Sequence, residues 1–313
     1  MSRSELLRGL ASRSVLMILL LTGCAYGKAR LGVSIAQFDD NFLMSVREAM
    51  ARRAAAAEAV EIQFQDAQGD VGRQLSQVQN FIAQRVDAIL VIAVDTAATR
   101  AITRAASNAA IPLVYVNRHP EERNLPAHVV VVGSDERLAG RLQMTELARL
   151  MHGRGNVAIM LGDLSNDATR GRTAGLKEIV ARYPAIRIVE EQSANFDRLK
   201  AMDLMINWMV KGTRIDAVAA NNDEMAIGAT LAIHQIPLSG RRILVAGVDA
   251  TSDAVAQIAR GRLAVTVFQN AKGQGERSVE DALRLARGQP VEQYDWIPFE
   301  LVTAQNYRNY VQR

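Results

Sequence analysis

The chain has 313 residues, 49% of them hydrophobic, and this length exceeds what one apolar core usually fills, so two domains are favoured. Its 37 Lys and Arg residues nearly balance 33 Asp and Glu residues, and the net charge of +4 is spread along the chain without a basic block. This balance, with no zinc-finger spacing and few aromatic residues, argues against a nucleic-acid partner.

The first segment has the pattern of a secretory signal peptide, which we predict over residues 1–28. Arg3, Arg8 and Arg13 precede the apolar run 15–21, and small residues follow this run. A permanent membrane helix needs about 20 apolar residues, and this run is shorter. We therefore expect the chain to be exported.

Cys24 is the only cysteine, so the mature protein can form no internal disulfide. Residues 21–24 resemble a lipobox, in which the cysteine is acylated and tethers the protein to a membrane. The alternative is cleavage between Ala25 and Ala29, which would release a soluble protein. The sequence leaves both open.

From Arg30 onward, short apolar runs alternate with amphipathic helical stretches in two successive series. Strands buried by helices on both faces are typical of parallel sheets with crossover connections. No Pro-, Gly- or Ser-rich linker separates the two series. The predicted fold is α/β, with two doubly wound parallel-sheet lobes. We expect strands at 31–35, 60–64, 88–93, 113–116, 129–132, 156–161, 187–192, 217–220 and 243–248, and helices at 42–59, 71–85, 97–109, 136–151, 170–182, 199–211 and 224–234.

Polar residues follow several of these strands directly. They are residues 39–41, Asn117 with Arg118, residues 221–223, and Asp249. Each group taken alone is read as a turn or a helix N-cap, since Asp and Asn commonly fill these roles. Ligands of open parallel sheets bind beyond the carboxyl ends of the strands, so recurrence at this edge favours a binding site.

The sequence lacks the common signatures of catalysis. It contains no Gly-x-Ser-x-Gly elbow, no phosphate loop and no dinucleotide fingerprint after the first strand. Its four histidines, His119, His128, His152 and His234, lack metal-ligand spacing. We predict no catalytic residue, metal or cofactor. The remaining amides, carboxylates and guanidinium groups are suited to binding hydroxyls, and an aromatic ring could cover the C–H face of a sugar.

Five segments carry a resemblance to a known family: residues 38–42, 114–118, 195–198, 221–228 and 247–250. With them the chain, from about Arg30 to its end, resembles the type I periplasmic binding proteins of bacterial sugar uptake, which include ribose and glucose/galactose binding proteins. Phe-Asp-Asp-Asn-Phe-Leu at 38–43 and Thr-Val-Phe-Gln-Asn-Ala at 266–271 are most similar to the inositol and rhizopine binding subgroup.

The resemblance implies a pocket shared by both lobes, in which polar side chains bind ligand hydroxyls and two phenylalanines form aromatic walls. Without it, Arg172 would be read as part of a surface salt bridge and Phe196 as a core aromatic. The implied ligand-binding residues are Asp40, Asn41, Phe42, Asn117, Arg118, Arg172, Phe196, Asn222, Asp249 and Gln269.

Two departures from the glucose/galactose proteins narrow the expectation. Where those proteins carry a His and an Asp before the arginine, this chain has Asn166 and Ala168, which argues against a hexose-type pocket. Their Asp-rich calcium loop is also missing, because residues 153–156 form only a short turn.

The resemblance also implies how the lobes are joined and what they serve. One lobe would comprise residues 29–134 and 270–298 and the other 135–269 and 299–313, with a hinge near Ser134, Gln269 and Pro298. We expect a monomeric periplasmic protein that delivers myo-inositol or a related derivative to the permease of an ABC importer. The alternative is a ribose- or galactose-like binding protein that signals to a chemoreceptor or sensor kinase.

Two other classes fit the sequence poorly. A transcriptional regulator of this fold needs a helix-turn-helix where the signal segment lies. A glycosidase needs two carboxylates flanking the scissile bond, whereas Asp40 and Asp249 lie among amides and arginines.

Overall fold

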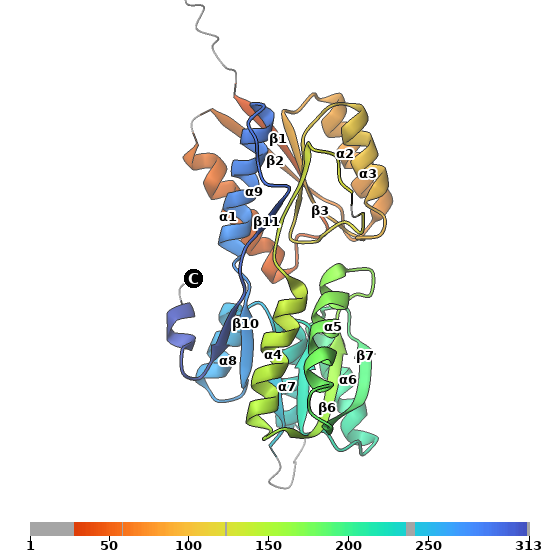
Figure 1. The fold of residues 1–313 in the computed structure, drawn as a ribbon, viewed down its shortest axis with the longest axis vertical. Coiled ribbons are helices and arrows are strands. Elements are labelled where there is room, and N and C mark those ends of the chain that lie inside the picture. The colour runs from red at the N-terminus through yellow and green to blue at the C-terminus, as the bar shows by residue number, and fades with distance from the viewer. Residues whose placement is uncertain (1–27, 58, 123, 236–241, 312–313) are drawn as a thin grey trace, which may run out of the picture.

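The computed structural model describes residues 28–57, 59–122, 124–235 and 242–311, so residues 1–27 of the predicted signal peptide, with Cys24, lie outside the described residues. Within them the chain forms two α/β lobes stacked along the long axis of the molecule (Figure 1). Each lobe is built around one six-stranded sheet. The predicted fold class is confirmed.

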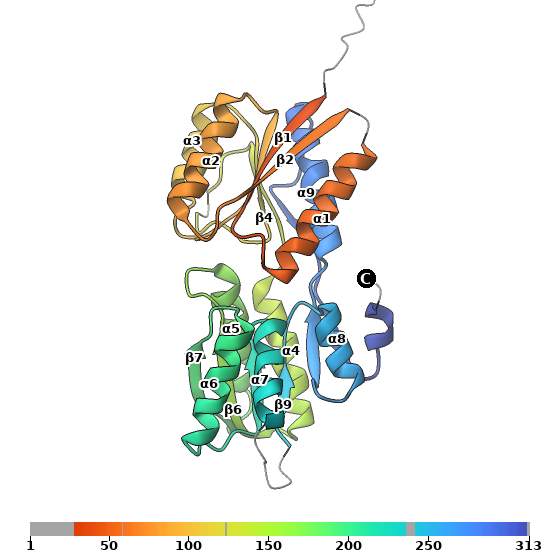
Figure 2. The ribbon, with the colours of Figure 1, turned by 180° about the vertical axis from the view of Figure 1, so that it is seen from behind.

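The sheet of the first lobe has the order β11-β5-β4-β3-β1-β2, and all its strand pairs are parallel. Helices α1 and α9 cover one face and α2 and α3 the other (Figures 1 and 2). Residues of β3 alternate between two apolar cores, because both faces of the strand are buried. The elements are β1 Ala29–Ile35, α1 Asn41–Ala56, β2 Val60–Asp66, α2 Val71–Ala83, β3 Ala88–Ile92, α3 Arg100–Asn108, β4 Leu113–Val116, β5 Val129–Gly133, α9 Ala271–Ala286 and β11 Tyr294–Trp296.

The sheet of the second lobe has the order β12-β10-β9-β8-β6-β7 and is parallel except for β12, which is antiparallel to β10. Helices α4 and α5 cover one face and α6, α7 and α8 the other (Figures 1 and 2). The elements are α4 Glu136–Leu150, β6 Arg154–Leu161, α5 Asp167–Val180, β7 Ala185–Ser193, α6 Arg198–Val210, β8 Ala217–Ala220, α7 Asp223–Gln235, β9 Leu244–Ala246, α8 Ser252–Ala259, β10 Val265–Phe268, β12 Glu300–Thr303 and a 3-10 helix Tyr307–Tyr310.

The chain passes between the two sheets at three points: between β5 and α4, between β10 and α9, and between β11 and β12. Two of these three passages adjoin strands of only three or four residues that the hydrophobic pattern does not identify. Asp40, Asn117 and Asn221 each follow a parallel strand, and all three lie on the side where the lobes meet.

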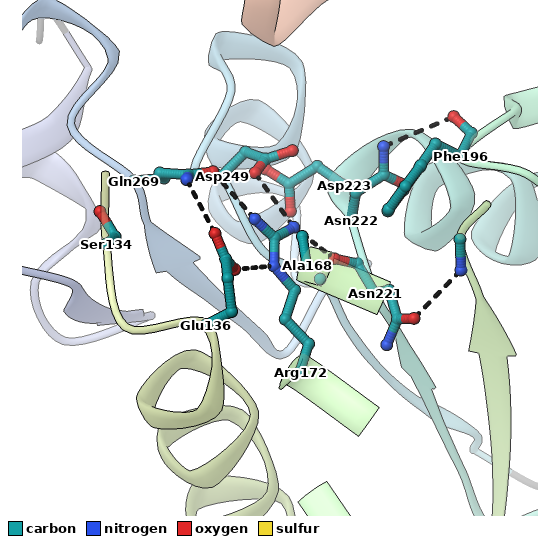
Figure 3. A network of polar contacts seen from close by, with 12 residues as sticks. Ser134, Glu136, Ala168, Arg172, Phe196, Asn221, Asn222, Asp223, Asp249 and Gln269 are labelled. Atoms are coloured by element: carbon teal, nitrogen blue, oxygen red, sulfur yellow. Dashed lines mark hydrogen bonds and ion pairs between the residues drawn. The ribbon is translucent and has the colours of Figure 1, made fainter. Parts of the chain in front are cut away.

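Helices α4 and α5 are in direct backbone contact through two glycines. A Cβ atom on Gly140 would overlap the carbonyl oxygen of Arg172, and one on Gly175 would overlap that of Arg137. The absence of side chains at these two positions therefore lets the helices approach closely. Their contact brings the first turn of α4 beside Arg172 on α5, where both face the other lobe (Figure 3).

Replacing Gly175 by Ala should lower the free energy of unfolding by about 1–3 kcal/mol, because the added methyl group has no space between the helices. The measurement is urea denaturation followed by circular dichroism. Gly72→Ala is the control, since Gly72 is exposed in α2 and alanine there should be neutral or add up to about 1 kcal/mol. Equal stability of Gly175→Ala and wild type would contradict the helix contact.

Candidate functional site

Nine of the ten residues predicted to bind ligand line one pocket between the lobes. The space open to the centres of water-sized molecules is about 30 Å³. One water needs about 10–15 Å³ on this measure, so the pocket is nearly closed as it stands. Its lining residues are Asp40, Phe42, Leu43, Asn117, Arg118, Asn166, Ala168, Arg172, Phe196, Asn222, Asp249 and Gln269.

The first lobe contributes residues that follow β1 and β4. Asp40 is also the N-cap of α1, where one carboxylate oxygen accepts a 2.8 Å hydrogen bond from the backbone N–H of Leu43. Arg118 is held by the carbonyl oxygen of Ala93, which accepts a 2.8 Å bond from Nη1. Burial lowers the pKa of Arg118. Asp40 is therefore a helix N-cap that also lines the pocket.

Three of the pocket residues have backbone angles that L-residues rarely adopt. The φ angle is 66° at Asn117, 60° at Phe196 and 119° at Asp249. Such conformations cost on the order of 1–3 kcal/mol each and are concentrated at binding sites. These backbone angles set the directions in which the three side chains leave the main chain. Because the three residues line one pocket, the angles favour a functional role for this pocket.

Arg172 is the central cation of the second lobe and is only 4% exposed. Its Nε donates to Oε2 of Glu136 at 2.6 Å, Nη1 to the carbonyl oxygen of Asn221 at 2.7 Å, and Nη2 to Oε1 of Gln269 at 3.0 Å (Figure 3). Burial acts to lower the pKa of Arg172, but the carboxylates of Glu136 and Asp249 outweigh this effect and raise it. The guanidinium group therefore stays charged in the pocket wall.

Asp249 is the buried carboxylate opposite this guanidinium. Its Oδ1 lies 3.5 Å from Nη1 of Arg172, which is too long for a strong hydrogen bond. Burial raises the pKa of Asp249 well above its usual value, Arg172 opposes this, and Asp223, Asp40 and Glu136 add to it. A buried carboxylate needs hydrogen-bond donors, and ligand hydroxyls in this pocket could supply them.

The two predicted aromatic walls come from opposite lobes, Phe42 from α1 and Phe196 from the segment before α6. A Cβ atom on Gly162 would overlap the ring of Phe196, so this glycine makes space for the ring at the end of β6. Phe196 is therefore positioned at the pocket and is not a core residue alone.

Asn41, the tenth predicted residue, lies outside this pocket. Its Nδ2 donates to Oε1 of Glu224 at 2.8 Å, and this bond joins the two lobes beside the pocket. Glu136 and Gln274 are polar residues near the site that the sequence analysis missed. Glu136 starts a helix and Gln274 lies within one, so in the sequence neither differs from an ordinary helix residue.

Further contacts between the lobes form a cluster that we name the clasp: Thr96, Glu121, Ser165 and Arg170. Nη2 of Arg170 donates to Oγ1 of Thr96 at 2.8 Å and lies 2.7 Å from Oε1 of Glu121, and Thr96 donates to the carbonyl oxygen of Ser165 at 2.9 Å. Both charged side chains are about half exposed, and exposed ion pairs contribute only about 0–1 kcal/mol. The clasp is therefore a weak closing contact.

No group of His, Cys, Asp or Glu side chains suited to a metal ion occurs in the part of the chain that the structure describes. The turn that leads from α4 into β6 lies at residues 151–153, and β6 already begins at Arg154, so the turn predicted at 153–156 lies about two residues earlier in the chain. In the same described part, each helix is too short or too polar to cross a bilayer.

Comparison with known sequences identifies the family. Residues 31–290 match the periplasmic binding protein domain, so the chain belongs to the periplasmic binding proteins. A protein of Rhizobium meliloti named as a candidate rhizopine-binding protein is 45% identical over 290 residues, which cover 92% of this chain and 94% of the relative. The ribose import binding protein of Bacillus subtilis is 31% identical, with 87% of each chain covered.

Solved structures agree with this family. An ABC transporter solute binding protein from Bacillus halodurans with bound myo-inositol is 43% identical with a TM-score of 0.86, covering 91% of this chain and 98% of that chain. A periplasmic solute binding protein from Actinobacillus succinogenes with bound D-allose is 27% identical with a TM-score of 0.85, covering 90% of this chain and all of the other. The resemblance to type I periplasmic binding proteins is confirmed.

The carboxylate of Asp223, beside Asp249, should make the stability depend on pH. Burial raises its pKa to about 7, although Thr266, Thr251 and their hydrogen bonds oppose this. An unfolded Asp titrates near pH ~3.9, so at intermediate pH the folded protein holds a proton that the unfolded chain has lost. This contribution to stability is present below about pH 4 and is lost as the pH rises through about 7.

Asp223→Asn should therefore reduce the loss of unfolding free energy between about pH 4 and about pH 7, by up to about 1.4 kcal/mol per pH unit. Chemical denaturation across this range measures it. Asp203→Asn, on an exposed position of α6, should keep the wild-type slope. An unchanged slope in Asp223→Asn would show that this carboxylate titrates normally.

Proposed function

We propose that this protein is the solute-binding component of an ABC importer, which captures one small uncharged polyol between its lobes. The observation that carries the proposal is the convergence of polar side chains from both lobes on one pocket with two aromatic walls. Amides, carboxylates and guanidinium groups together match hydroxyls, which both donate and accept hydrogen bonds.

The charge of the pocket lining supports an uncharged ligand. The lining residues include two carboxyl groups, Asp40 and Asp249, and two guanidinium groups, Arg118 and Arg172, so neither kind of charged side chain is in excess. An additional buried charge without a partner would cost several kcal/mol, on the order of the penalty for one desolvated ion. Phosphorylated or carboxylated sugars therefore fit the site poorly.

Among uncharged polyols we propose myo-inositol or a related inositol derivative. The similarity to a rhizopine-binding relative and to a structure with bound myo-inositol supports this choice, as do residues 38–43 and 266–271. Position 168 in the pocket lining is Ala, whereas the glucose/galactose proteins carry an acidic residue in this region, and this difference argues against a hexose as the ligand.

Ligand entry requires the lobes to separate, because the closed pocket leaves space for only about two water molecules. We propose that they rotate about the passages near Ser134, Gln269 and Pro298, with lobes of residues 29–134 plus 270–298 and 135–269 plus 299–313. A ligand that contacts both lobes stabilises the closed form by its differential affinity. A permease would bind this closed form in the periplasm, the protein acting as a monomer and without turnover of ligand.

A thermal-shift screen of polyols and monosaccharides tests the ligand class. At about 100-fold excess over Kd a ligand stabilises the folded state by about 2.7 kcal/mol, which corresponds to several degrees in Tm. We expect myo-inositol to give the largest shift, with ribose, galactose and glucose 6-phosphate giving little. A strong shift with a pentose or galactose and none with inositol would refute the assignment.

Asp249→Ala should abolish the shift with myo-inositol, because the lost acceptor leaves ligand hydroxyls unpaired in a buried site. The Tm without ligand should stay close to that of wild type or rise, since a desolvated carboxylate is removed. Asp203→Ala, at an exposed position, is the matched control and should bind normally. Retention of the full shift by Asp249→Ala would exclude Asp249 from the site.

Arg170→Ala should weaken ligand binding about two- to fivefold, although Arg170 does not line the pocket, because it removes the two contacts of the clasp that Arg170 makes, with Thr96 and Glu121, from the closed form. Isothermal titration calorimetry measures the effect, and small-angle scattering should show a more open unliganded protein. Arg104→Ala on the exposed face of α3 controls for loss of charge. Unchanged affinity would mean that the clasp does not contribute to closure.

A further inference from the structure

Glu136 is a buried carboxylate that lies next to the pocket but does not line it. It is the first residue of α4, two positions after Ser134, where the chain enters the second lobe. Its Oε2 accepts the 2.6 Å bond from Nε of Arg172, and its Oε1 accepts a 3.4 Å bond from Nε2 of Gln269 (Figure 3). Only 5% of this residue is exposed.

We propose that Glu136 is a positioning residue, which holds the Arg172 guanidinium in the orientation that binds ligand and keeps its 3.5 Å ion pair with Asp249 from becoming a direct bidentate pair. This inference rests on the proposed function and deepens it, because it assigns ligand affinity to a residue that does not touch the ligand.

The donors of Arg172 support the assignment. A guanidinium group carries five N–H donors, and the bonds to Glu136, to the carbonyl of Asn221 and to Gln269 use one on each nitrogen. One N–H on Nη1 and one on Nη2 are then available to a bound ligand. Glu136 therefore fixes the plane of the group and leaves its outer edge available.

Asp249 is the carboxylate that would compete for this guanidinium. It is 3.5 Å from Nη1, while Glu136 is 2.6 Å from Nε on the other edge. If Glu136 lost its charge, the attraction between Arg172 and Asp249 would be unopposed, and a direct bidentate pair would become the favoured arrangement. Such a pair would use the oxygens of Asp249 that ligand hydroxyls need.

The backbone keeps Glu136 in place. A Cβ atom on Gly171 would overlap the Cβ atom of Glu136, so α5 lies directly against the first turn of α4. Asp135, the N-cap, accepts hydrogen bonds from the N–H groups of Arg137 and Leu138 and fixes the start of the helix. The carboxylate therefore has little freedom to follow a displaced Arg172.

The same segment also connects the site to the other lobe. Nε2 of Gln274 donates to Oγ of Ser134 at 3.0 Å, and Oε1 of Gln274 accepts a 3.1 Å bond from Asn117. Polar contacts thus lead from Asn117 in the first lobe through the 134–136 passage to Arg172 in the second. A change at Glu136 should alter affinity through Arg172 while leaving the apolar cores intact.

The test measures myo-inositol affinity by isothermal titration calorimetry in wild type, Glu136→Gln, Arg172→Lys and the double variant. Glu136→Gln keeps the size and an acceptor but removes the charge, and we expect about a tenfold loss of affinity together with a lower unliganded Tm, because the buried Arg172 cation loses a charged partner. In the Arg172→Lys background the same substitution should change affinity less than about twofold, because its effect acts through Arg172.

A spectroscopic measurement of hydrogen exchange supplements the affinities of these four proteins and needs no ligand. The Nε–H proton of Arg172, assigned by its absence in Arg172→Lys, should exchange slowly with solvent in wild type and faster in Glu136→Gln. Glu146→Gln is the matched control, because Glu146 is a buried carboxylate on the same helix that pairs with Arg149 at 2.6 Å, far from the pocket. It should leave affinity and this exchange rate unchanged.

The inference is overturned if Glu136→Gln binds myo-inositol like wild type, or if it weakens binding equally in both backgrounds. Unchanged Nε–H exchange in Glu136→Gln would also overturn it. If wild type itself binds none of the screened polyols, the proposed function fails and this inference fails with it. If wild type binds myo-inositol and one of the results above is found, this inference alone fails.

Discussion

The buried guanidinium of Arg172 is the constraint on which the site depends. Removing such a cation from water costs several kcal/mol, on the order of the penalty for any desolvated ion, unless charge and hydrogen bonds compensate. Glu136, Gln269 and the carbonyl of Asn221 provide this compensation from three different elements. The buried charge of Arg172 on α5 therefore requires acceptors from α4 and from the segment after β8 close to it. The glycine contact between α4 and α5 makes that arrangement sterically possible.

Apolar cores on both faces of each sheet provide the rigid frame that such a site requires. The strands are buried on both faces, so their carboxyl ends cannot move independently of the sheet. The polar residues after these strands can then be held in costly backbone conformations, as at Asn117, Phe196 and Asp249. A stable frame thus supports the unusual backbone angles of these three pocket residues.

The sequence predicted the fold class and most of the pocket, because both depend on local patterns. Buried strands of four or more apolar residues are visible as runs, and the polar residues that follow them are adjacent in the chain. Short strands such as β11, with three residues and exposed side chains, carry no such pattern. Glu136 could not be recognised because its role comes from a contact with Arg172, 36 residues away, and a glutamate at a helix start is ordinary. Asn41 is adjacent to two pocket residues, but its side chain is directed to Glu224.

The contacts between the lobes differ in strength in a way that suits a reversible closing motion. The Arg170–Glu121 ion pair of the clasp is about half exposed and is worth at most about 1 kcal/mol, and the Asn41–Glu224 bond is also exposed. The bonds of Arg172 to Glu136 and Asn221 are buried and lie within the second lobe, so opening the lobes does not break them. In the proposed closing motion, closure would be weakly favoured by the protein alone, and the bonds that hold Arg172 would persist when the lobes separate. A ligand that bridges Arg118 and Asp249 across the gap then adds the differential free energy that a two-state equilibrium needs.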